Sequence, residues 1–152
     1  MENEYAFYMN IHDLYILMNQ RMEQIGKNNG ELSYGQYRIL RCIAKANERQ
    51  INQQQLVDET YLRRSTISQH LKRLTDKGYI SHTMTKDDHR CKEIAITDAG
   101  LSALQKMDRL LDGQWNQVVS DSQIEDCNQL LIQVKKNWWL FPTPTIYKEE
   151  TL

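Results

Sequence analysis

The chain has few of the residues that mark a secreted, membrane or zinc-binding protein. Its 152 residues include three cysteines, none in a CxxC pair, which argues against a disulfide framework and a cysteine-based zinc site. No apolar run approaches the roughly 18 residues of a membrane span, and the first residues are acidic where a signal peptide would be basic. We therefore predict a cytoplasmic protein with reduced thiols and no membrane partner.

Catalytic and cofactor motifs are also missing. The sequence contains no nucleophile elbow, phosphate-binding loop or HExxH motif. Its four histidines show no metal-ligand spacing with one another or with the cysteines. An enzyme would need a constellation that assembles only in three dimensions. We therefore predict a protein that is not an enzyme, with no catalytic residues, no cofactor and no metal site.

What the chain does have is an uneven distribution of charge. The net charge is −1 at pH 7, yet residues 61–92 contain eight basic and three acidic residues, a net charge of +5. The remainder of the chain therefore carries a net charge of −6. A basic centre within an acidic protein predicts one face that meets a polyanion.

The spacing of apolar residues predicts two helices before the basic centre. Over residues 8–25 the apolar residues recur every three or four positions, and the Asn-Asn-Gly segment 28–30 ends this long first helix. Ser33 and Gln36 have the spacing of a capping box. A second helix therefore starts there and ends near Asn47.

The same signals predict a closely spaced pair of helices next. Asn52 and Gln55 repeat the capping-box spacing and start a short third helix, which cannot extend far past Thr60. A fourth helix runs from Arg64 to a glycine cap at Gly78. Its inward apolar residues are Ile67, Leu71 and Leu74.

A change of pattern after the fourth helix predicts a β-hairpin. Residues 79–85 and 93–97 are rich in strand formers and should pair, and the charged residues 86–92 between them form the tip. Helical spacing returns over 101–118 and again from Ser120 to before Pro142. The predicted fold class is mainly α, a winged helix-turn-helix with a two-stranded β-wing between long N- and C-terminal helices.

This arrangement places the fourth helix in a major groove of DNA and the wing tip beside the neighbouring backbone or minor groove. Basic side chains would contact phosphates, and short polar ones would contact base edges and backbone oxygens. Each residue alone fits an ordinary solvated face equally well, but their coincidence with this spacing favours DNA binding. The candidate DNA-binding residues are Arg63, Arg64, Ser65, Thr66, Ser68, Gln69, Lys72, Arg73, Lys86, Asp88, His89 and Arg90.

Three segments between Leu32 and Gly100 carry a family resemblance. They read LSYGQYRIL, LVDETYLRRSTISQHLKRLTDKGYI and DDHRCKEIAITDAG. Through them the chain resembles the MarR family of winged helix-turn-helix transcriptional regulators. The third segment is the most specific, because its Asp88, Arg90, Ile94, Ile96, Thr97 and Gly100 are similar to the family's wing signature. In that signature the aspartate braces the arginine that enters the DNA groove.

The resemblance implies a homodimer, formed by the first helix and the last two helices, that binds a pseudo-palindromic operator in double-stranded DNA. We expect a repressor, because blocking promoter DNA needs no surface that contacts polymerase. Family members often bind small aromatic ligands between the dimerisation helices and the DNA-binding lobe, so a small-molecule effector is also implied. His12, Tyr15 and Tyr37 are the candidate pocket residues, although a core or dimer seam is favoured for the stripe of the first helix.

Two residues of the helix-turn-helix depart from the family pattern. Tyr61 stands where the family commonly has glycine in the turn, which costs about 1 kcal/mol if the site requires a positive φ. Arg63 stands where the family commonly has a serine cap, and losing that cap costs about as much. Ser65 or Thr66 would take over the cap, or Arg63 would add a phosphate contact.

Alternative functions remain open on the sequence alone. Cys91 lies between two cations that favour the reactive thiolate, which fits a redox-responsive regulator, whereas Cys42 and Cys127 lie on apolar stripes and are predicted to be core residues. A DNA-binding protein without an effector and a winged-helix protein–protein adaptor are further alternatives. The predicted organisation is an N-terminal dimerisation helix (1–30), a DNA-binding domain (31–100), C-terminal dimerisation helices (101–141) and a tail (142–152).

Overall fold

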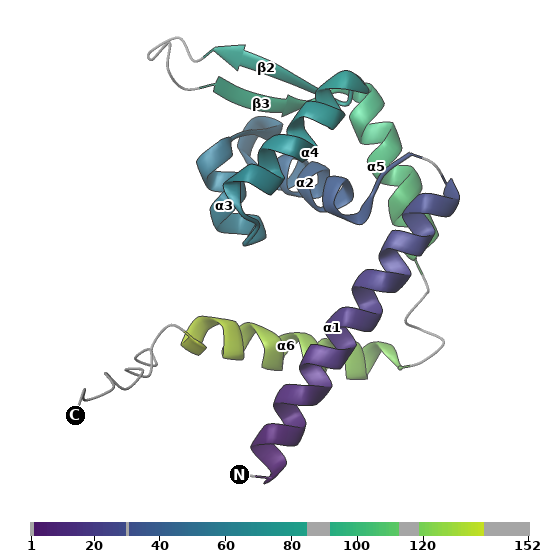
Figure 1. The fold of residues 1–152 in the computed structure, drawn as a ribbon, viewed down its shortest axis with the longest axis vertical. Helices are drawn as coiled ribbons and strands as arrows, with labels where there is room; N and C mark the ends of the chain where they lie inside the picture. Colours follow the sequence, from purple (N-terminus) through teal and green to yellow (C-terminus); the bar gives the residue numbers. More distant parts are fainter. Residues whose placement is uncertain (1, 30, 85–91, 113–118, 139–152) are drawn as a thin grey trace, which may run out of the picture. The chain divides into compact units, whose positions relative to one another are not determined.

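A computed structural model of the chain describes residues 2–29, 31–84, 92–112 and 119–138. The chain divides into two compact units, residues 1–111 and 112–152, which we describe separately. The first unit contains α1 (Glu2–Asn29), α2 (Tyr34–Lys45), a 3-10 turn (Asn47–Arg49), β1 (Gln50–Asn52), α3 (Gln53–Thr60), α4 (Arg64–Asp76), β2 (Ile80–Met84), β3 (Lys92–Ile96) and α5 (Asp98–Leu111) (Figure 1). The second unit contains α6 (Asp121–Trp138).

The predicted capping boxes are present at the starts of the helices. In α2 the Ser33 hydroxyl accepts a hydrogen bond from the Gln36 backbone N–H at 3.3 Å, and the Gln36 side chain accepts from the Ser33 N–H at 3.0 Å. Asn52 and Gln55 exchange the same two bonds at the start of α3, both at 2.9 Å. Each box satisfies two backbone donors that a helix start leaves unpaired, so the local sequence determines where these helices begin.

The sheet is larger than the predicted two-stranded wing. The strands β2 and β3 pair antiparallel as expected, with Ile80 opposite Ile96, but β1 also pairs with the other edge of β3. The strand order is β1-β3-β2. The prediction missed β1 because its three residues are too few to show an alternating pattern. Ile51 is its anchor, since this buried side chain stands opposite the buried Ile94.

The core of the first unit forms around α2. Ile39, Leu40 and Ile43 of this helix are fully buried, and α3, α4, β3 and α5 all contact it. The predicted inward face of α4 is confirmed, because Ile67, Leu71 and Leu74 are buried in the same cluster. From α5, Ala103, Leu104 and Met107 join them. A single apolar core therefore holds the helix-turn-helix, the sheet and α5 together.

The first helix is longer than the predicted 8–25 and joins this core only through its C-terminal part. Met22 is buried and Ile25 packs against the core, whereas the preceding turns expose large apolar side chains to solvent. These exposed residues are Tyr5, Phe7, Tyr8, Ile11, Leu14, Tyr15, Ile16 and Leu17.

The second unit also exposes apolar side chains to solvent. The helix α6 begins after Ser120, as predicted, and the Ser120 backbone N–H donates to the Gln123 side chain while the Ser120 hydroxyl accepts from the Gln123 N–H. It exposes Leu130, Leu131 and Ile132. Cys127 is also exposed within the described part of this unit, in contrast to its prediction as a core residue. Among the described helices, none is long and apolar enough to span a membrane.

Candidate nucleic-acid interface

The helix α4 separates its apolar and polar residues onto different faces. While three of its side chains enter the core, most of the predicted DNA-binding residues of this helix are exposed, and Thr66 is half-buried. The exposed residues are Arg63, Arg64, Ser65, Ser68, Gln69, Lys72 and Arg73. Arginine and lysine are the side chains that contact phosphates, and serine and glutamine can contact base edges. The structure thus presents basic and hydrogen-bonding groups together on one solvent-facing surface.

The turn before α4 is held in place by hydrogen bonds from both sides. The buried Thr60 ends α3, where its hydroxyl donates to the Leu56 carbonyl at 2.5 Å. Arg38 of α2 donates to the Thr60 carbonyl at 2.6 Å. Tyr61 follows with φ of 56°, in the left-handed region. The site therefore does have the positive φ on which the cost of a non-glycine residue depends, and the surrounding bonds hold the backbone in that strained conformation.

The cap position of α4 is also as the sequence indicated. Arg63 has the extended backbone of an N-cap residue, but its side chain makes no capping hydrogen bond. An arginine side chain has only hydrogen-bond donors, so it cannot accept a bond from the N–H groups of the first helical turn. The side chain instead lies exposed at the start of α4.

A hydrogen-bonded chain links α3 to the exposed start of α4, and sequence reasoning missed it. The amide of Gln53 donates to the Ser68 hydroxyl at 2.7 Å, and that hydroxyl donates to the Arg64 carbonyl at 3.0 Å. The guanidinium of Arg64 donates to the side-chain oxygen of Gln54. The amide of Gln54 donates to the Asp58 carboxylate at 3.0 Å. Two predicted DNA-binding residues, Ser68 and Arg64, are therefore oriented by glutamines of the preceding helix.

The base of the wing is held by hydrogen bonds of Thr97 and Gly100, two residues of the wing signature that the structure describes. The Thr97 hydroxyl donates to the Gly78 carbonyl at 2.7 Å and accepts from the Gly100 N–H at 3.1 Å. A Cβ on Gly100 would collide with the Tyr79 carbonyl, which explains the glycine. The wing-tip predictions Lys86, Asp88, His89 and Arg90, together with Cys91, lie outside the described residues.

The three predicted pocket residues occupy different surroundings. His12 stacks with Tyr8 on the exposed part of α1, and Tyr15 is also exposed. Tyr37 is instead buried in α2, where its hydroxyl donates to the Asp108 carboxylate of α5 at 2.8 Å. Within the described residues of this chain, Tyr37 therefore lines no surface with the other two.

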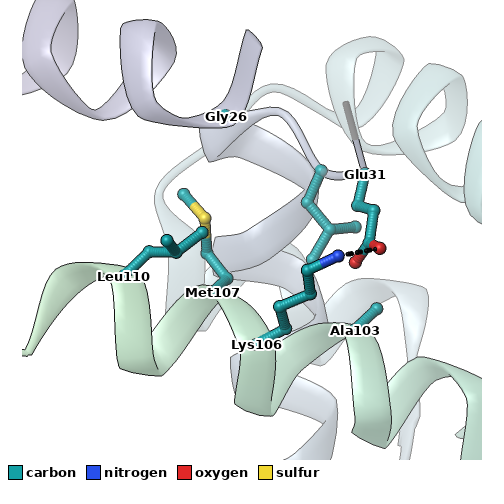
Figure 2. Close-up of a pocket in the computed structure, with 7 residues that line it drawn as sticks. Gly26, Glu31, Ala103, Lys106, Met107 and Leu110 are labelled. Atoms are coloured by element: carbon teal, nitrogen blue, oxygen red, sulfur yellow. Dashed lines mark hydrogen bonds and ion pairs between the residues drawn. The ribbon is translucent and has the colours of Figure 1, made fainter. Parts of the chain in front are cut away.

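The cavities near these helices differ in size and polarity. Figure 2 shows residues that line a small cavity between the end of α1 and α5, among them Gly26, Met107 and Leu110, and the ion pair of Lys106 and Glu31 at 2.5 Å, which also belong to the lining. Its volume is about 10 Å³, at the lower limit of the space that can hold one water molecule. A groove of about 640 Å³ lies between α2 and α3 and is open to solvent. Its lining carries charges of both signs, from Arg38, Arg41, Lys45, Asp58 and Glu59.

Burial shifts the pKa of three side chains of the first unit. It raises the pKa of Tyr37 to about 12, with help from the hydrogen bond to Asp108. It raises the pKa of the Cys42 thiol, which keeps this cysteine in its less reactive protonated form. It lowers the pKa of His70, in α4, an effect that nearby Arg73 reinforces and Glu23 opposes.

Two helices joined by a tight turn, followed by a hairpin and an exposed basic helix face, define a winged helix-turn-helix protein. The model of the MarR family matches residues 31–90. Over these residues the chain is similar to the MarR family, and its fold is the winged helix-turn-helix fold of solved MarR family structures. The predicted resemblance to the MarR family and the predicted fold class are confirmed.

Individual relatives agree with this assignment. The chain is 31% identical over 72 residues to the HTH-type transcriptional regulator SarZ of Staphylococcus haemolyticus, a match that covers 47% of this chain and 48% of the relative. The chain thus matches about half the length of that relative. Its fold is similar to that of Sco3205 of Streptomyces coelicolor, a MarR family transcriptional regulator solved in complex with DNA. There the TM-score is 0.77 at 15% identity, covering 90% of this chain and 88% of the other.

A second solved structure shows the same fold. The transcriptional regulator BldR of Sulfolobus solfataricus has a TM-score of 0.74 at 20% identity. The similarity covers 87% of this chain and 96% of that one.

Proposed function

We propose that this protein is a sequence-specific DNA-binding transcriptional regulator that acts as a repressor on a pseudo-palindromic operator. The observation that carries the proposal is the exposed face of α4, which presents basic and hydrogen-bonding side chains, while the apolar residues of the opposite face are buried in the core. The DNA complex of Sco3205, a protein of the same fold, supports the same reading.

In the proposed mechanism, α4 enters the major groove. Arg63, Arg64, Lys72 and Arg73 contact phosphates, and they position the helix on the duplex. Base edges are contacted by the polar residues near the helix start, Ser65, Thr66, Ser68 and Gln69. The wing tip, with Lys86, Asp88, His89 and Arg90, contacts the adjacent groove, where narrow A·T-rich stretches attract arginine.

We further propose that the protein works as a homodimer held together by α1 and the C-terminal helices. The exposed apolar side chains of α1 extend from Tyr5 to Leu17, and α6 exposes three consecutive ones of its own. Apolar patches of this extent are rare on the surface of a monomer and mark interaction surfaces. A two-fold dimer would place two copies of α4 about one DNA turn, roughly 34 Å, apart.

A small-molecule effector would act through this spacing. A ligand that binds better to one arrangement of the dimer shifts the population toward it and changes the separation of the two α4 helices. DNA affinity then falls although no DNA-contacting residue is touched. We retain His12, Tyr15 and Tyr37 as candidate effector residues in the assembled dimer, since one chain alone leaves the first two exposed.

Selection of bound fragments from a random DNA pool tests the proposal directly. We expect an enriched palindrome whose half-sites are about 10 base pairs apart, centre to centre. Binding to that fragment should weaken steeply with added salt, because each phosphate contact releases counterions. Replacement of the wing arginine, Arg90→Ala, should weaken binding as well.

An adaptor that uses the winged fold without nucleic acid would give a different result. It would enrich no sequence, and Arg90→Ala would leave any weak DNA binding unchanged. Enrichment of a single asymmetric half-site would leave the DNA-binding function in place but would contradict the dimer. Sedimentation of the free protein provides the matching measurement, with a dimeric mass as the expected result.

A further inference from the structure

Three consecutive glutamines, Gln53 to Gln55, begin α3, and each side-chain amide has different hydrogen-bond partners. Gln55 completes the capping box with Asn52. Gln53 donates to the Ser68 hydroxyl of α4. Gln54 lies between two charged residues, donating to Asp58 one turn further along α3 and accepting from Arg64 at the start of α4. The glutamine run therefore connects the first helix of the helix-turn-helix to the exposed start of the second.

The bonding capacities of the three side chains determine the orientation of the Gln54 amide. An ionised carboxylate only accepts hydrogen bonds, and a guanidinium only donates them. The Gln54 amide must therefore direct its N–H groups toward Asp58 and its oxygen toward Arg64. Both observed hydrogen bonds have this orientation. Because the amide is neutral, Arg64 is held in place without a direct ion pair that would compete with phosphate for its charge.

We propose that Gln54 is a positioning residue that holds the Arg64 guanidinium toward the phosphate backbone of DNA, an inference that rests on the proposed DNA-binding function. A free arginine side chain loses rotamer freedom when it binds phosphate. The bond to Gln54 restricts the guanidinium before DNA arrives, which lowers that loss. Arg64 is exposed, so its remaining donors face solvent on the surface that we assign to DNA.

A double-mutant cycle on the selected DNA fragment tests this role. The variants are Gln54→Leu, Arg64→Ala and the combination of both. We expect Gln54→Leu to weaken binding by about fivefold in the wild-type background and to have almost no effect when Arg64 is already alanine, because coupled residues are not additive. Leucine is a good helix former, and matching thermal midpoints will show that the variant folds.

The salt dependence separates positioning from contact. Removing Arg64 should reduce the slope of log affinity against log salt by about 0.9, the value for one phosphate contact. Gln54→Leu should leave that slope nearly unchanged, because Arg64 still contacts the phosphate. Only the number of conformations that the Arg64 side chain adopts before binding increases. Gln54→Glu should weaken binding and reduce the slope, because its carboxylate competes with phosphate for Arg64.

Gln53→Leu is the matched control, one residue earlier on the same helix and bonded to Ser68 instead of the Arg64 side chain. Any loss it causes should be equal in the wild-type and Arg64→Ala backgrounds. If Gln54→Leu lowers DNA affinity equally in both backgrounds, or in neither, the positioning role is overturned. The proposed function stands in that case as long as the wild-type protein binds DNA. Failure of the wild-type protein to bind any DNA fragment instead removes the proposed function and this inference with it.

Discussion

The imidazole of His70 in α4 occupies the space that a side chain on Gly35 of α2 would fill. The ring Nε2 lies 2.5 Å from the position of an ideal Cβ on Gly35, far inside van der Waals contact. The ring Nδ1 is buried and has no hydrogen-bond partner among the described residues. This contact fixes how closely α4 approaches α2, and so it sets the position of the surface that we assign to DNA.

Gly35→Ala should therefore destabilise the fold. Overpacking at a close contact costs about 1–3 kcal/mol of unfolding free energy, which denaturant titration will measure. The same change in a His70→Ala background provides the control. There the added methyl has room, and the better helix propensity of alanine should make the change neutral or stabilising by up to about 1 kcal/mol. Equal losses in both backgrounds would show that the imidazole is not the obstacle.

Stability should also decrease in mild acid through His70. Its pKa is lowered from 6.5 in the folded protein, by burial first and then by Arg73, so the unfolded chain binds the proton more tightly. The stabilising contribution is full above pH 6.5 and is lost as the pH falls through the lower pKa of the folded state. Unfolding free energies from about pH 8 to about pH 5 should decline less in His70→Gln. Parallel curves for the two proteins would contradict this assignment.

Tyr61→Gly should stabilise the protein. The residue has φ of 56° and its side chain is 66% exposed, so glycine relieves backbone strain with little loss of packing. We expect a gain of about 0.5–1 kcal/mol in unfolding free energy. Tyr61→Ala separates the two effects, because alanine removes the ring but keeps the strain. A similar gain from both variants would assign the effect to the ring instead of the backbone.

The contact between α2 and α5 should depend on Asp108. Its carboxylate accepts from the Tyr37 hydroxyl at 2.8 Å and from the Arg41 guanidinium at 2.6 Å. The ion pair with Arg41 is largely exposed and contributes little, whereas the Tyr37 hydroxyl is left without its acceptor in Asp108→Ala. We expect a loss of about 1–2 kcal/mol, and a smaller loss from the same change in a Tyr37→Phe background. Additive losses would exclude the hydroxyl as the cause.

Alkaline titration gives an independent measure of the same contact. The pKa of Tyr37 is raised to about 12, so the folded state disfavours the phenolate, and the associated stability is present below pH 10 and lost as the pH rises through about 12. The tyrosine absorbance difference between wild type and Tyr37→Phe isolates this group. Asp108→Asn should move its transition to lower pH. An unchanged transition would show that burial alone accounts for the shift.

Much of this molecule was determined by local sequence. The capping boxes at Ser33 and Asn52 start their helices because each bond joins residues three positions apart, and the inward face of α4 follows from helical spacing. The same spacing left the basic and polar residues of α4 on the outer face. The strand β1 was missed because its pairing with β3 joins residues more than 40 positions apart, and three residues carry no pattern of their own.

The tertiary structure decided the relationships that cross between elements. Whether Gln54 bonds Arg64, and whether Gly35 faces His70, depends on how the turn at Tyr61 directs α4 across α3 and α2. A glutamine or glycine has the same local preferences wherever its partners lie, so sequence spacing identifies neither contact. Sequence therefore predicted the starts of α2 and α3, the pairing of β2 with β3 and the exposed residues of α4. Only packing decided which side chains hold that surface in position, because those contacts form after the core brings distant residues together.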